Sequence, residues 1–188
     1  MKNAIEVPEG VSFQEAIALT QSFLSQLASG QISPKETEAF VATLVGSKDG
    51  VRGFFVAYLT DDRPFADNPT REVVQGLRST PETIGEVLVK NVAMSAAMVV
   101  HHRREDNEEM AKQSERVRDR SIGLIRHLNL PQLREIAVSL RDSTRGEGGE
   151  YETFLQRWGY DGEQRQAMAI ALSAAIDAPH KSPSPDYD

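Results

Sequence analysis

Apolar side chains recur every three or four residues through most of the chain, which is the period of an α-helix. No run shows the sustained apolar–polar alternation of a half-buried strand. The pattern predicts helices over these ranges: 12–29, 33–45, 51–60, 70–77, 81–128, 130–140, 151–158 and 164–176. The predicted fold class is therefore all-α, a single-domain multi-helix bundle.

Local signals mark the ends of the first helices. Ser12 with Glu15, and Ser33 with Glu36, have the spacing of capping boxes, in which side chains satisfy free backbone N–H groups. The range 51–60 is ambiguous because it combines strand propensity with no alternation. No second strand exists to pair with it, so we interpret it as a buried helix.

The longest predicted helix runs from 81 to 128. Its first half is apolar on nearly every side, which is typical of a helix at the centre of a bundle. At His101 the chain turns polar, and Asp106 and Asn107 mark a possible bend. Four residues continue an apolar seam at heptad-like spacing: Met110, Val117, Leu124 and Leu128.

This seam gives the candidate partner interface. A straight helix over 81–128 would be ~70 Å long, whereas a globule of this size has a radius of gyration of only ~16 Å. A projecting helix would need a second copy of the chain to cover the seam. A helix bent near 106 would let residues 130–140 cover it. We favour the first alternative, a homodimer of moderate affinity.

Composition narrows the function classes. The 188-residue chain has no Cys, which excludes disulfides and Cys-ligated zinc, and its net charge of −7 argues against nucleic acid as a partner. The N-terminus lacks the apolar run of a signal peptide. The apolar stretch 87–100 is shorter than the ~20 residues of a membrane span, so we expect a cytoplasmic protein without membrane contact.

The same reading divides the chain into three parts. Residues 1–11 are an irregular lead-in, 12–177 form the helical domain, and 178–188 are predicted to be a disordered tail rich in Pro and Ser.

The sharpest chemical signal is a set of possible metal ligands on one helix. His101 and His102 lie one turn from Glu105, and Glu108 and Glu109 follow. A di-iron bundle needs two Glu-x-x-His units, and this chain contains none. We therefore expect no bound metal and no cofactor, with these side chains marking the point where a helix leaves the core.

Three further groups have ordinary explanations. Arg116, Arg118, Arg120 and Arg126 alternate with acidic residues and predict a solvated helix face. Asp61, Asp62, Arg63 and Asp67 share a proline-containing loop, where turn chemistry explains them. Tyr151, Phe154, Trp158 and Tyr160 predict a local core patch, or alternatively an exposed patch that docks a partner.

Two segments resemble known families. Residues 24–59 contain Leu-x-x-Gly, Ile-Ser-x-x-Glu and Phe-Phe-Val-x-x-Leu. This pattern resembles the helical N-terminal domain of anthranilate phosphoribosyltransferases and pyrimidine nucleoside phosphorylases, which mediates dimer contacts. Their Gly-Thr-Gly-Gly-Asp phosphate loop is missing, so the resemblance does not imply transferase activity. The run from Arg52 to Asp61 and the His-His-Arg-Arg helix resemble an uncharacterised all-helical family with cyanobacterial members.

The leading prediction is a non-catalytic helical module that binds another protein and self-associates. The alternative is a small-molecule- or metal-binding helical bundle, and so a possible enzyme, built around His101, His102 and Glu105. The exposure of the two histidines discriminates between these predictions.

Overall fold

A computed structural model describes residues 5–146 and 148–177. Within this part of the chain every regular element is a helix, so the all-α prediction is confirmed. The helices are α1 (Phe13–Ala28), α2 (Pro34–Leu44), α3 (Lys48–Thr60), α4 (Arg71–Arg78), α5 (Pro81–Arg104), α6 (Glu108–Leu128), α7 (Pro131–Thr144), α8 (Glu152–Arg157) and α9 (Gly162–Ile176).

Side-chain caps explain where the first three helices begin. Both predicted capping boxes are present, at Ser12 of α1 and Ser33 of α2. The ambiguous range 51–60 is helical, and α3 begins earlier than predicted because Ser47 accepts a hydrogen bond from the Gly50 N–H. The buried-helix interpretation of this segment is confirmed.

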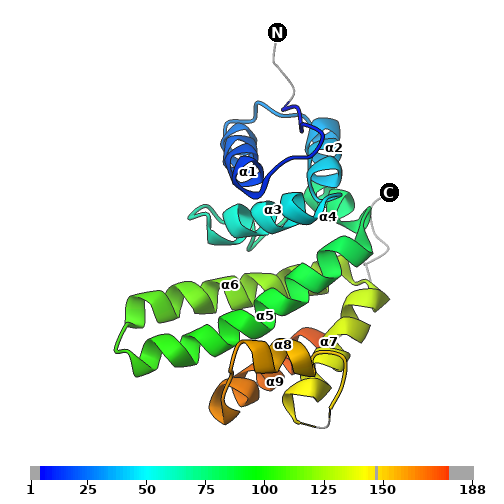
Figure 1. The fold of residues 1–188 in the computed structure, drawn as a ribbon. Helices are drawn as coiled ribbons and strands as arrows, with labels where there is room; N and C mark the ends of the chain where they lie inside the picture. Colours follow the sequence, from blue (N-terminus) through cyan, green and yellow to red (C-terminus); the bar gives the residue numbers. More distant parts are fainter. Residues whose placement is uncertain (1–4, 147, 178–188) are drawn as a thin grey trace, which may run out of the picture.

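The first four helices pack as two close pairs, α1 on α3 and α2 on α4 (Figure 1). Glycines allow both approaches. A Cβ added to Gly53 would lie 2.5 Å from the Ala16 Cβ, and one added to Gly76 would lie 2.7 Å from the Val41 Cβ. Only a residue without a side chain fits at these helix crossings.

The predicted helix 81–128 is two helices. The chain reverses at residues 105–107, and α5 and α6 pack along their length as a hairpin (Figure 1). Asp106 has a φ of 53°, which Asp tolerates, and Asn107 caps α6 by accepting from the Met110 N–H. The predicted bend near 106 is therefore confirmed. The prediction of a continuous projecting helix is wrong, because turn and capping residues end the first helix at Arg104.

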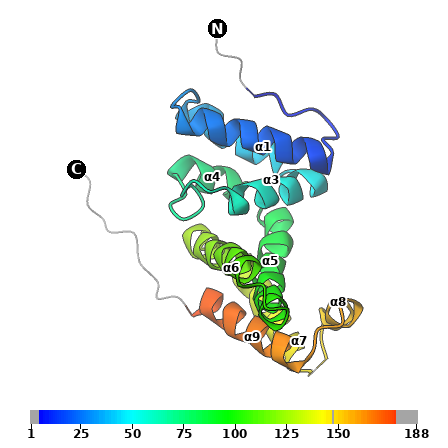
Figure 2. The same ribbon diagram turned by 90° about the vertical axis from the view of Figure 1, so that its left-hand side faces the viewer.

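The remaining helices cover the hairpin from the other side. In Figure 2, α3 and α4 lie above α5 and α6, whereas α7, α8 and α9 lie below. Arg126 and Arg134 fix the end of α9 by donating to the carbonyls of Ala174 and Ile176. The hairpin is thus the central layer.

One apolar core joins all three layers. It includes Leu44, Phe54, Phe55, Leu88 and Val92, whereas Val99 is buried outside this cluster. In the described residues, α5 is the one helix long and apolar enough to span a membrane by length and composition, and half of its 18-residue apolar window is buried inside the protein. The prediction for the tail, 178–188, lies outside the described residues.

Candidate functional site

The seam predicted to bind a second copy lies largely inside the protein. Leu124 and Leu128 are fully buried, and Val117 is half-buried against the core. Only Met110, at the hairpin tip, is exposed, at 39%. Because α6 folds back on α5, the chain covers most of its own seam, and it does so with α5 rather than with the predicted helix 130–140.

The candidate metal ligands lie at the same tip and do not converge. His101 is exposed and His102 half-buried, while Glu105 and Glu109 are exposed. No group of three or more His, Asp or Glu side chains in the described part of the chain could hold a metal ion. The arrangement therefore lacks the shared ligand geometry on which the metal-binding alternative depends.

Arg120 corrects the prediction of a solvated arginine face. This side chain is only 5% exposed and spans the gap from α6 to the loop between α3 and α4. Its guanidinium makes two bonds to the Asp67 carboxylate, at 2.9 and 2.7 Å, and donates to the carbonyls of Leu59, Asp61 and Arg63. Every N–H of a buried cation is thereby satisfied, as burial requires.

Neighbouring contacts complete this loop attachment. The Tyr58 hydroxyl donates to the Phe65 carbonyl at 2.7 Å, and Arg116 donates to the Asp62 carboxylate at 3.1 Å. The hydrogen bond from Arg120 lowers the pKa of Asp67, against the opposing effect of burial. The sequence showed the arginines and the acidic loop as separate sets, and only the fold brings them together. The donors of Arg120 are thus all used by carboxylate and carbonyl groups of the protein itself.

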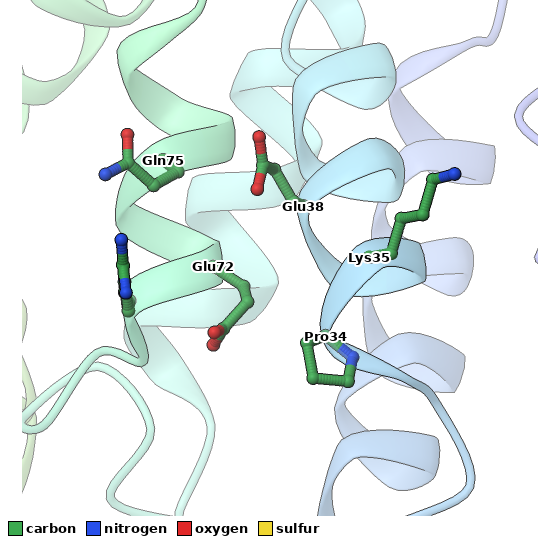
Figure 3. Close-up of a pocket in the computed structure, with 6 residues that line it drawn as sticks. Pro34, Lys35, Glu38, Glu72 and Gln75 are labelled. Carbon is green, nitrogen blue, oxygen red and sulfur yellow. The ribbon is translucent and has the colours of Figure 1, made fainter.

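A shallow hollow of about 420 Å³ lies between α2 and α4 (Figure 3). Its lining residues are Pro34, Lys35, Glu38, Arg71, Glu72 and Gln75. Glu38 and Glu72 extend into the space between the helices, while the Lys35 ammonium points away from them. The lining combines two carboxylates with the cations Lys35 and Arg71, so its charge is balanced and favours neither an anionic nor a cationic ligand.

The aromatic cluster of the last two helices is the more informative surface. Tyr151 is buried and Phe154 and Tyr160 are half-buried, but Trp158 is 58% exposed. Trp158 follows α8, and Gly159, with a φ of 65°, turns the chain away directly after it. The prediction of a local core patch is therefore confirmed for Tyr151 and wrong for Trp158.

Two contacts tie this segment to α5. The Lys90 ammonium lies 5.3 Å from the centre of the Phe154 ring, and Arg104 pairs with Asp161 at 2.5 Å. Trp158 lies between Phe154 and Asp161 in the chain, and Met94 and Met98 lie between Lys90 and Arg104 on α5. Both methionines are half-buried and lie on the outward side of α5. We call Met94, Met98 and Trp158 the α5–α8 surface.

Ion pairs lie on α5 both before Met94 and after Met98. Glu86 accepts from Lys90 at 2.7 Å, and Arg104 contacts both Asp161 and Glu163. Hydrogen bonds from Arg104 and from the Gln164 backbone lower the pKa of Asp161 to about 2. An apolar centre with an aromatic anchor and a paired polar rim is the usual composition of a protein interface.

The comparisons with known proteins place the chain in a family. Residues 12–175 match the model of the family described as "Uncharacterised conserved protein UCP020893", and the chain belongs to this family. That agrees with the resemblance to an uncharacterised all-helical family. No curated protein and no solved structure matches the chain. The resemblance to phosphoribosyltransferases has no support from these comparisons.

Proposed function

We propose that this protein is a non-catalytic helical interaction module that self-associates through the α5–α8 surface. The observation that carries the proposal is Trp158, the chain's single tryptophan, which is more than half exposed. The half-buried Met94 and Met98 lie on α5 between Lys90 and Arg104, the two residues of α5 that contact the segment of Trp158. Tryptophan dominates the energetically important positions of protein interfaces, and methionine adapts its shape to a partner.

The arrangement of α5 supports the same proposal. A helix that is apolar on nearly all sides normally sits inside a bundle, yet half of the most apolar window of α5 is left unburied by its own chain. A second copy of the protein would remove Met94, Met98 and Trp158 from water together. Because the side chains of the predicted α6 seam are mostly internal, this surface replaces that seam as the expected contact.

Sedimentation equilibrium tests the proposal. We expect a monomer–dimer equilibrium with a dissociation constant on the order of 10 μM, a moderate affinity. Trp158→Ser and Met98→Ser should each weaken it by about tenfold or more, the size expected for an interface hot spot. Emission from Trp158 should shift to shorter wavelength as concentration rises, because the indole leaves water.

Ile170→Ser is the matched control. Ile170 is an exposed apolar residue at 65%, on α9 and outside the α5–α8 surface. Its substitution should leave the dissociation constant unchanged. Equal weakening by all three substitutions, or a monomer at every concentration with an intact fold, would refute self-association through this surface.

A further inference from the structure

We propose that Lys90 is a positioning residue whose charge holds α8, and with it Trp158, in the binding arrangement. This inference rests on the proposed function for its consequence, but its structural part stands on contacts of the monomer. Loss of the Lys90 charge is expected to release α8 while the central hairpin remains folded.

The Lys90 ammonium lies at the centre of a four-residue cluster. It is 2.7 Å from a Glu86 oxygen and 5.4 and 5.3 Å from the ring centres of Tyr151 and Phe154. The Tyr151 hydroxyl donates to the other Glu86 oxygen. Two rings and a carboxylate around one ammonium form an arrangement that selects a cation. Glu86 and Lys90 belong to α5, whereas Tyr151 and Phe154 belong to the start of α8.

The short helix α8 is attached by apolar contacts of Tyr151, Phe154 and Leu155 with the core, and by few polar contacts. It contains six residues, and Leu155 is the buried side chain within it. A helix of that length is not stable by itself, since its nucleation cost is repaid by few hydrogen bonds. Glu152 contacts Arg165 only at 3.4 Å. The Lys90 cluster is therefore the main polar connection between α8 and the central hairpin.

The placement of Trp158 depends on this connection. Phe154 is one helical turn before Trp158, and Asp161, held by Arg104, follows three residues later. The segment that carries Trp158 is thus fixed at both ends on α5. Without the Lys90 charge, this end keeps the buried Leu155 and the Tyr151–Glu86 hydrogen bond but loses its contacts with an ammonium. Binding would then have to order a looser segment first, at an entropic cost.

Two matched substitutions test the role of the charge. Lys90→Met keeps an unbranched apolar stem and removes the ammonium, whereas Lys90→Arg keeps a cation that can contact Glu86 and both rings. The first measurement is hydrogen exchange of the α8 amides and acrylamide quenching of Trp158, both on dilute monomer. The second is the dissociation constant of the dimer.

In Lys90→Met we expect α8 amides to exchange about tenfold faster or more, while the amides of α5 and α6 keep their protection. The same variant should dimerise about tenfold more weakly, and Lys90→Arg should restore both properties toward those of the natural chain. Unchanged α8 exchange and Trp158 quenching in Lys90→Met would overturn the positioning role. If the natural chain proves monomeric, the exchange result still decides the positioning role, whereas only the proposed function fails.

Discussion

The loop between α3 and α4 and the short helix α8 each have one cationic side chain at the centre of their attachment to the central hairpin. Arg120 of α6 holds the loop from a buried position, and all of its donors are used. Lys90 of α5 holds α8 from a site where its side chain is 32% exposed. The first segment is held by a buried cation, and the second by a partly exposed one.

This difference follows from the chemistry of the two cations. A guanidinium offers five N–H donors in a fixed plane, so Arg120 can satisfy a carboxylate and three carbonyls together. An ammonium is a compact charge that tolerates a carboxylate and two ring faces. The locked loop serves the fold, whereas the lightly attached α8 carries the exposed Trp158.

The hairpin is the common platform, so damage to it should exceed damage to either attachment. Leu88, fully buried in α5, tests this, and Leu88→Ala should lower the free energy of unfolding by about 2–5 kcal/mol, the cost of a buried leucine deletion. Urea denaturation measures it. A loss below about 0.5 kcal/mol would mean that α5 is not the central helix.

Removing the arginine attachment should have the next largest effect. Arg120→Met leaves the Asp67 carboxylate and the Leu59 carbonyl without their partner. We expect a loss of about 3 kcal/mol, at the lower end for a broken buried ion pair because the Asp67 side chain is 45% exposed. Arg120→Lys should recover only part of it. An unchanged free energy of unfolding in Arg120→Met would show that other contacts hold the loop.

The lysine attachment should matter less for global stability. Lys90→Met should lower the free energy of unfolding by about 1 kcal/mol, the sum expected for a half-exposed ion pair and cation–π contacts. The comparison is made by parallel urea denaturation of Lys90→Met and Arg120→Met. A loss as large as that of Arg120→Met would erase the proposed distinction between a locked and a lightly attached segment.

The pH dependence should show the smallest difference. The pKa of Asp67 is lowered by Arg120, so the stability it contributes is present at neutral pH and is lost as pH falls from about 4, the ordinary Asp range, through the lowered value. Asp67→Asn should therefore reduce the slope of stability against pH below about 4 and leave it unchanged between about 5 and 8. An identical acid slope in both proteins would contradict the Arg120–Asp67 contribution.

Much of the fold was predictable from residues close together in the sequence. Capping boxes at Ser12 and Ser33 and the helical period of the apolar residues fix where helices lie, because these signals act within one or two turns. The same holds for the break near Asp106, where turn and capping residues interrupt the helix.

The tertiary structure alone decided which side chains are buried and which distant residues they contact. The seam from Met110 to Leu128 looks available for a partner in the sequence, but chain reversal at Asp106 places Leu124 and Leu128 in the core. Arg120 meets Asp67 across 53 residues, and Lys90 meets Phe154 across an even longer separation. Helical periodicity identifies which side chains share a face, but it cannot identify what the face meets. That depends on how the helices pack, and packing here buries Leu124 and Leu128 of the predicted seam and leaves Trp158 exposed.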